Sequence, residues 1–145
     1  MSTILIVDDL AVFREPVAAA LRLMGYETIC AANGYEALMA VHNHRPDLVL
    51  LDLAMPVFDG LAFLRELRSE PKHANLPVIL LTAIIERDKI VQAGKLGVRD
   101  YLLKKGFSFD ELHARMANLL NQKKPGNYET VAQIQSSLKD LDGGG

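Results

Sequence analysis

The chain has 145 residues, of which 50% are hydrophobic, and its formal net charge is −2. A chain of this length can bury a core as one domain, and its charge balance gives no reason to expect nucleic-acid binding. No apolar stretch approaches the ~20 residues that cross a bilayer, and the apolar stretch in MSTILIVDDL is too short for a signal peptide. We therefore expect a cytoplasmic protein that binds neither membrane nor nucleic acid.

Short apolar segments alternate with stretches of helical spacing over residues 3–121. The expected strands are Thr3–Val7, Tyr26–Ala31, Asp47–Leu51, Val78–Leu81 and Arg99–Leu103. The expected helices are Leu10–Met24, Tyr35–Asn43, Gly60–Glu70, Glu86–Leu96 and Phe107–Asn121. This alternation predicts an α/β fold, a parallel sheet with helices on both faces and right-handed crossovers. With five strands, we expect the flavodoxin-like doubly wound (βα)5 fold of strand order 2-1-3-4-5.

Two residues in the first half of the chain need comment. Pro16 lacks an N–H group, so a helix that begins near Val12 or Phe13 would place it in the first turn, where N–H groups have no partner within the helix. We expect this helix to end at Gly25, which can act as its C-cap. The single cysteine, Cys30, cannot form an internal disulfide, and its apolar neighbours predict a buried thiol.

The last part of the chain does not continue the alternation. Proline and glycine in Lys123–Asn127 interrupt it, and Tyr128–Leu141 has the apolar spacing of one more helix. We therefore divide the chain into a domain at residues 1–121 and a C-terminal extension at residues 122–145, with one helix and then a flexible tail. The sequence leaves open whether this helix packs on its own domain or links to another.

Four of the expected strands end in residues of related chemistry. These are Asp8 and Asp9 after the first strand, Asp52 after the third, Thr82 after the fourth and Lys104 after the fifth. Parallel strands bring their carboxyl ends to one edge of the sheet, where open α/β folds bind their ligands. Each residue alone has an ordinary explanation, such as a helix cap or a solvated charge. Together they indicate a site.

The acids of this site would repel one another unless a cation joins them. Two carboxylates ~4 Å apart repel by about 4 kcal/mol at an effective dielectric constant of 20. Oxygen ligands without histidine or cysteine favour Mg²⁺. A lysine and a hydroxyl beside Mg²⁺ suit phosphoryl transfer, and a carboxylate can itself be the nucleophile.

Four segments together resemble the receiver domains of response regulators, the CheY-like domains of two-component signal transduction. They are Asp8-Asp9, LDLAMPVFDG around Asp52, Thr82-Ala83 and Tyr101–Lys104. The resemblance spans residues 3 to about 121, and the motifs are highly specific in combination. It implies a signalling phosphoprotein, not an enzyme, which catalyses only its own phosphorylation and dephosphorylation.

The resemblance also implies a donor for the phosphoryl group, a residue that accepts it and a set of residues that bind Mg²⁺. Asp52 would accept it from a phosphohistidine on a sensor histidine kinase or on a phosphotransfer protein in a phosphorelay. Asp9, Asp52 and the backbone carbonyl of Ala54 would bind Mg²⁺ directly, and Asp8 would act through water.

The remaining implied roles concern the response to phosphorylation. Lys104 and Thr82 would contact phosphoryl oxygens, Ala83 would leave space for the group, and Tyr101 would change rotamer as Thr82 moves. An output partner of unknown identity would bind the surface of the fourth helix, the fifth strand and the fifth helix. The sequence also leaves open whether the chain forms a homodimer.

The chain departs from the family in two places. Lys105-Gly106 stands where the family usually has proline after the lysine, in a bond that is usually cis. A non-proline cis bond costs about 2.5–4 kcal/mol, so we predict a trans Lys104–Lys105 bond, a turn at Gly106, and Lys104 still in reach of the acids. Ala54 and Ile84 replace residues that are often polar in relatives, so neither orients an attacking water.

Three other functions fit the sequence less well. A phosphatase of the haloacid dehalogenase type needs a second aspartate two residues after the nucleophile, and this position is Ala54. A flavin-binding module would meet repulsion between its phosphate and Asp8-Asp9. A phosphorylation-independent interaction module normally lacks part of the acid set, which is complete here.

Overall fold

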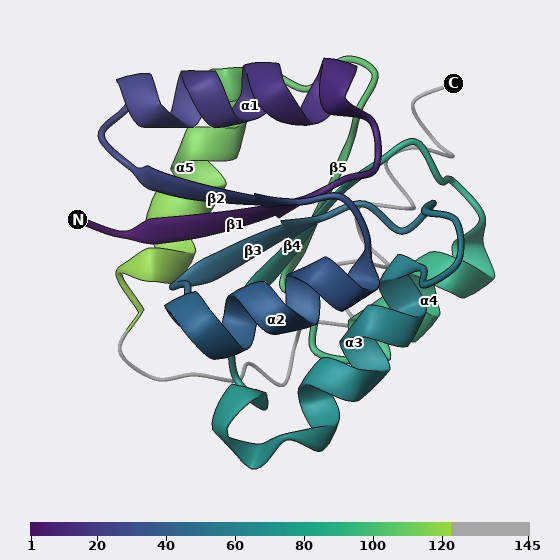
Figure 1. Ribbon diagram of the computed structural model, residues 1–145. Helices are drawn as coiled ribbons and strands as arrows, with labels where there is room; N and C mark the ends of the chain where they lie inside the picture. Colours follow the sequence, from purple (N-terminus) through teal and green to yellow (C-terminus); the bar gives the residue numbers. More distant parts are fainter. Residues whose placement is uncertain (123–145) are drawn as a thin grey trace.

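The computed structural model describes residues 1–122, and the helix expected at residues 128–141 lies outside them. Strands and helices alternate along this part of the chain (Figure 1). The strands are β1 (Thr3–Val7), β2 (Glu27–Ala31), β3 (Leu48–Leu51), β4 (Val78–Thr82) and β5 (Asp100–Leu103). The helices are α1 (Ala11–Leu23), α2 (Gly34–His44), α3 (Gly60–Ser69), α4 (Arg87–Lys95) and α5 (Phe109–Leu120), with a short 3-10 helix at Pro71–His73.

All neighbouring strands are parallel, and the order of the 5-stranded sheet is β2-β1-β3-β4-β5. Helices α1 and α5 cover one face of the sheet, and α2, α3 and α4 cover the other (Figure 1). The predicted fold is therefore confirmed. The order places β1 beside β3, so that the acids following these two strands come together.

The apolar run of β3 explains why this strand lies in the centre of the sheet. Leu48 and Leu50 pack in the core under α1 and α5, while Val49 and Leu51 pack in the core under α2, α3 and α4. Side chains alternate between the faces of a strand, so a strand covered on both sides must be apolar throughout. The rigid centre of the sheet thus carries Asp52 at its end.

Two local predictions were wrong. Helix α1 begins at Ala11, so Pro16 lies inside the helix beyond its first turn, where it removes the N–H that the Val12 carbonyl would accept. Val12 is 85% exposed, and an exposed turn tolerates this loss because water can reach the carbonyl. Cys30 is exposed, because β2 is an edge strand and its neighbours in sequence do not cover it.

Within residues 1–122, no helix is long and apolar enough to cross a membrane.

Candidate functional site

The sheet brings the two buried acids of the site together. Val7 and Leu51 are partners in the β1–β3 register, so Asp8 and Asp52 follow them at adjacent positions. The Asp52 N–H donates to the Val7 carbonyl (2.9 Å), which continues the ladder to the last residue before the loop. Both carboxylates are fixed by strand backbone rather than by a flexible loop.

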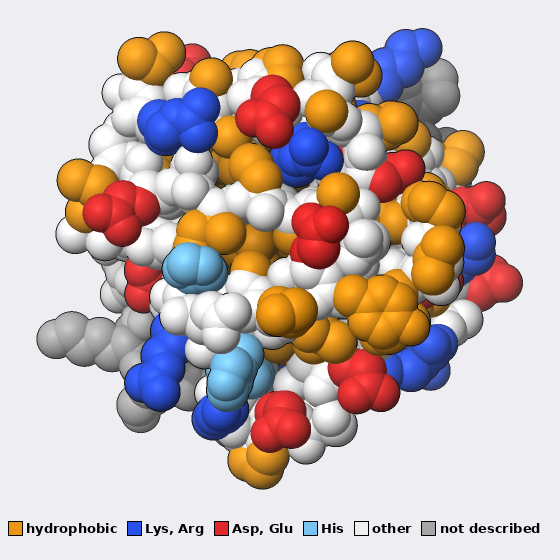
Figure 2. Space-filling model, in the orientation of Figure 1, with side chains coloured by type: hydrophobic (Ala, Val, Ile, Leu, Met, Phe, Trp, Pro, Cys, Tyr) orange, Lys and Arg blue, Asp and Glu red, His pale blue; other side chains and the backbone are white. Residues whose placement is uncertain are grey.

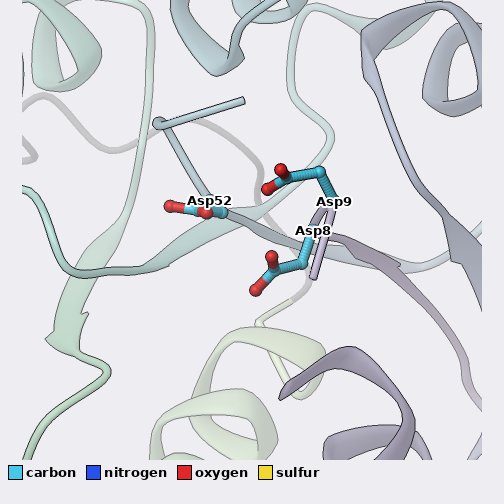
Figure 3. Close-up of side chains that lie close together, drawn as sticks. All are labelled: Asp8, Asp9 and Asp52. Atoms are coloured by element: carbon cyan, nitrogen blue, oxygen red, sulfur yellow. The ribbon is translucent and has the colours of Figure 1, made fainter. Parts of the chain in front are cut away.

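Asp8, Asp9 and Asp52 form one carboxylate cluster. One oxygen from each lies within 4.8 Å of the others, and Figure 3 shows the three side chains converging from the ends of β1 and β3. Asp8 and Asp52 are each 3% exposed, while Asp9 is partly exposed. Within residues 1–122 this is the one group of acidic, histidine or cysteine side chains with metal-ligand spacing. The donors are all carboxylate oxygens, the set that fits Mg²⁺.

Lys104 supplies the positive charge that the cluster needs without a metal. Its Nζ lies 2.7 Å from Asp8 Oδ2 and 3.2 Å from Asp52 Oδ2. Burial alone would lower the pKa of Lys104, but the hydrogen bond to Asp8 and the charges of Asp52 and Asp8 outweigh it and raise the pKa. The lysine is therefore charged at neutral pH and lies where a phosphoryl group on Asp52 would need a cation.

The pKa of Asp8 is raised, chiefly by burial, although hydrogen bonds from Lys104 and from the Leu10 N–H act in the opposite direction. A raised pKa means that the folded protein disfavours the charged carboxylate. In the folded protein, therefore, the ionised form of the Asp8 carboxyl is less favourable than in water.

Thr82 contacts Asp52 directly. Its hydroxyl donates to Asp52 Oδ1 (2.6 Å) and accepts from the N–H groups of Ile84 (3.2 Å) and Leu53 (3.4 Å). The hydroxyl is fully buried at the end of β4. It therefore connects the Asp52 carboxylate to the loop that leads into α4.

Tyr101 connects the same loop to β5. Its side chain is buried, and its hydroxyl donates to the Ile84 carbonyl (3.0 Å). Ala83, next to Thr82, and Ala54, next to the cluster, are both exposed.

The loop after β3 is held close to the site by Gly60 and Asp59. A Cβ on Gly60 would lie 2.6 Å from the Asp52 carbonyl oxygen, so only glycine fits there. Asp59 caps α3 by accepting the Ala62 N–H (2.9 Å). Val57, between them and Asp52, has φ +68°, which is a strained conformation for a β-branched residue.

The turn after Lys104 is as predicted. Within residues 1–122 no peptide bond is cis, so the Lys104–Lys105 bond is trans, and Gly106 has φ +92°. Glycine adopts this conformation without steric cost. Lys104 therefore reaches both acids without the cis bond that the family usually has.

Sequence reasoning missed two residues that hold the site. The Lys104 Nζ lies 4.6 Å from the centre of the Phe13 ring, within range of a cation–π interaction. Arg14 Nη1 donates to the Asp8 carbonyl (2.7 Å). Both lie in the first turn and a half of α1, just after the acid pair, and this proximity in sequence was the available signal.

Comparison with known proteins agrees with this geometry. The family model of the response regulator receiver domain matches residues 4–117. The chain belongs to this family of two-component signalling proteins.

Full-length relatives carry more than this domain. The chain is 38% identical to the phosphate regulon transcriptional regulatory protein PhoB of Pseudomonas aeruginosa over 138 residues, which are 95% of the chain and 60% of the relative. It is 40% identical to the response regulator MprA of Mycobacterium avium, over 93% of the chain and 58% of the relative. It is 39% identical to the regulatory protein AtoC of Escherichia coli, over 97% of the chain but only 27% of the relative. The chain thus spans less than two thirds of these proteins.

Solved structures show the same fold. A response regulator from Chloroflexus aurantiacus has a TM-score of 0.77 and 35% identity, over 83% of this chain and 98% of that one. The chemotaxis response regulator CheY4 of Vibrio cholerae has a TM-score of 0.74 and 29% identity, over 82% of this chain and 98% of that one.

Proposed function

We propose that Asp52 is the phosphoacceptor of this receiver domain and that a sensor histidine kinase or a phosphotransfer protein supplies the phosphoryl group. The observation that carries the proposal is the placement of Lys104, whose Nζ bonds both buried acids of a three-carboxylate cluster. Such a cluster with a buried cation and hydroxyl has the charges that phosphoryl transfer needs.

Mg²⁺ is part of this proposal. Asp9, Asp52 and the backbone carbonyl of Ala54 would hold it, and Asp8 would act through water. When bound, Mg²⁺ neutralises charge on the transferred group and permits it to approach three acids. The donor set of the cluster supports this choice, since it contains only oxygen.

The transfer itself exchanges one bond to phosphorus for another. A carboxylate oxygen of Asp52 bonds to phosphorus as the phosphorus–nitrogen bond of the donor phosphohistidine breaks, and the electron pair leaves with the imidazole. Lys104 then contacts a phosphoryl oxygen. The domain catalyses this step and the later hydrolysis of its own acyl phosphate, and it acts as a signalling protein in the cytoplasm.

Phosphorylation would act through Thr82. Its hydroxyl now donates to Asp52 Oδ1 (2.6 Å), and a phosphoryl group on Asp52 offers it a new acceptor. The loop through Ile84 would follow, because Thr82 and Tyr101 both bond its main chain. We propose that Tyr101 then shifts and that α4, β5 and α5 change their affinity for an output partner, as a shift between two populations.

Acetyl phosphate and intact mass spectrometry test the proposal. With Mg²⁺ the protein should gain roughly one phosphoryl mass, in the acid-labile form expected of an aspartyl-phosphate. Asp52→Asn should gain none. Asp88→Asn, which removes an exposed acid from α4, is the matched control and should behave as wild type. An equal gain in Asp52→Asn would refute the assignment.

A further inference from the structure

The Lys104 ammonium group contacts an aromatic ring as well as two acids. Its Nζ lies 2.7 Å from Asp8 Oδ2, 3.2 Å from Asp52 Oδ2 and 4.6 Å from the centre of the Phe13 ring. A cation over an aromatic face at this distance is attracted by the electrons of the ring. The Lys104 side chain is only 12% exposed, whereas the lysine and arginine side chains seen in Figure 2 lie at the surface. The position of this ammonium group therefore depends on its three neighbours.

The main chain after Lys104 does little to fix that position. The Lys104 N–H donates to the Thr82 carbonyl (3.0 Å), and beyond this bond the segment leaves the sheet. Lys105 and Gly106 are exposed, and a Cβ on Gly106 would meet nothing within 4 Å. The direction of the lysine is thus set by contacts of its side chain.

The Phe13 ring, in contrast, has a fixed place. It lies in the first turn of α1 and packs on the core under α1 and α5. Arg14 Nη1 donates to the Asp8 carbonyl (2.7 Å), which ties this turn to the acid pair. The Phe107 ring lies 5.9 Å from the Phe13 ring and 5.2 Å from the Phe109 ring. This row of rings joins α1 to the loop that follows Lys104, and in Figure 1 that loop passes beside the start of α1.

The ring differs from the two acids in its response to a metal ion. Asp52 is a proposed Mg²⁺ ligand and Asp8 a proposed ligand through water, so Mg²⁺ would compete with Lys104 for both acids. A bound dication also repels an ammonium group beside it. The Phe13 ring carries no net charge and is no metal ligand, so its attraction for Lys104 persists. It is the contact that a metal ion would not take from the lysine.

We propose that Phe13 is a positioning residue whose ring keeps the Lys104 ammonium at the site while a metal ion occupies the acids. The lysine is then in place to contact a phosphoryl oxygen. This inference rests on the proposed function, because Lys104 meets a phosphoryl group only if Asp52 accepts one. A leucine at position 13 fills much of the same apolar space but does not attract a cation. Phe13→Leu therefore separates positioning from packing.

NMR of the lysine side chain tests the contact directly. The ring current of Phe13 should move the ε-methylene protons of Lys104 upfield of those of the other lysines, and Lys104→Met identifies the signal by its absence. Phe13→Leu should abolish this upfield shift, and Phe13→Tyr, which keeps the ring, should retain it. Saturating Mg²⁺ should leave the shift in place in wild type. Its loss on addition of Mg²⁺, or its persistence in Phe13→Leu, would overturn the proposal.

The rate of labelling by acetyl phosphate tests the consequence. At saturating Mg²⁺, Phe13→Leu should lower the maximal rate about fivefold, the size of one partly buried cation–π contact, and Phe13→Tyr should restore it. Tyr26→Leu is the matched control, since Tyr26 packs on the same core at the other end of α1, against the His113 ring (5.6 Å). It should label at the wild-type rate. An equal loss in Phe13→Leu and Tyr26→Leu, or no loss in Phe13→Leu, would overturn the proposal.

The two readouts distinguish this proposal from the proposed function. A wild type that takes up no phosphoryl group contradicts the proposed function, and the ring-current shift then reports by itself whether Phe13 holds Lys104 in the presence of Mg²⁺. A wild type that is labelled at the same rate as Phe13→Leu contradicts the role of Phe13 alone.

Discussion

Two partly buried cations lie at opposite ends of the sheet and have opposite surroundings. At the carboxyl end, Lys104 contacts the carboxylates of Asp8 and Asp52. At the amino end, Arg68 has only main-chain acceptors within residues 1–122, and Arg99 nearby is a second cation. The acid cluster has three carboxylates beside one lysine. Within residues 1–122, Arg68 has no carboxylate among its hydrogen-bond partners.

The amino end is a structural clamp. Arg68 donates to the carbonyls of Leu96 (2.7 Å), His73 (2.8 Å) and Gly97 (3.3 Å), so it ties α3 to the turn between α4 and β5. Burial, together with the charge of Arg99, lowers the pKa of Arg68 to about 10. Arg68 keeps its charge at neutral pH, because a pKa of about 10 still lies well above 7.

Backbone strain also differs between the acid cluster and the Arg68 clamp. Val57 follows the phosphoacceptor candidate and has φ +68°, whereas the positive φ of the clamp, +85°, belongs to Gly97. A β-branched residue is strained in this conformation and glycine is not. Unfavourable charge and a strained β-branched residue thus occur together beside the acids, where strain is expected to serve function. The other non-glycine residue with positive φ in residues 1–122, Arg45 (φ +47°), is the C-cap of α2 at the opposite end.

The largest effect on stability is expected from Arg68→Met. It leaves three main-chain carbonyls without their donor, and each unsatisfied buried group costs about 1–3 kcal/mol. Relief of repulsion from Arg99 offsets part of this, so we expect a loss of about 3 kcal/mol in urea denaturation. Mg²⁺ should not restore it. A loss below about 1 kcal/mol would show that the clamp is not structural.

Lys104→Met should also destabilise the metal-free protein, but here Mg²⁺ should restore stability. Removal of a charge that competes for Asp8 and Asp52 should tighten Mg²⁺ binding roughly tenfold, since a dication and a cation a few ångströms apart repel by about 1–2 kcal/mol even in water. Titration calorimetry measures this affinity. Weaker Mg²⁺ binding in Lys104→Met would contradict our account of the cluster.

Asp8→Asn should stabilise the metal-free protein by about 1 kcal/mol. It removes one of three mutually repelling carboxylates, the one whose pKa burial raises. Denaturation in EDTA measures the change, with Asp88→Asn as the control that should show no gain. The same variant should bind Mg²⁺ more weakly. A loss of stability would mean that the bond to Lys104 outweighs the repulsion.

The smallest effect is expected from Val57→Gly. Relief of backbone strain should stabilise the folded protein slightly more than the flexibility of glycine stabilises the unfolded chain. The free energy of unfolding should therefore rise by less than about 1 kcal/mol. Gly97→Ala, the matched change at the clamp, should lower the free energy of unfolding. Alanine would be strained at the φ of +85° that Gly97 has, and its Cβ would lie 3.2 Å from Arg68 Nε. Opposite signs in thermal denaturation support the comparison, and equal signs contradict it.

The two ends also differ in how far sequence could predict them. The acid cluster was predictable, because each expected strand that contributes to it is followed by one of its residues, namely Asp8, Asp52, Thr82 and Lys104. The carboxyl ends of parallel strands lie at the same edge of a sheet. The clamp was not predictable, since Arg68 lies on α3 and Leu96 in the turn after α4, and only packing brings them together. The contact of Phe13 with Lys104 was missed for the same reason.

The errors in the fold were local and had physical causes. Spacing of apolar residues set the strands and the sheet order, but it could not fix the first residue of α1, where Leu10 makes no side-chain cap. Exposure of Cys30 depends on β2 being an edge strand that nothing in residues 1–122 covers on its outer side, a property of the assembled sheet. The division of the chain at residue 121 remains a prediction.

The most direct test of the central claim locates the phosphoryl group. After reaction with acetyl phosphate and Mg²⁺, borohydride reduces an aspartyl-phosphate to homoserine, and peptide sequencing by mass spectrometry finds its position. We predict homoserine at position 52, with aspartate unchanged at Asp8 and Asp9, and none anywhere when EDTA replaces Mg²⁺. Homoserine at either of the other two acids, or its absence from position 52, would contradict the account.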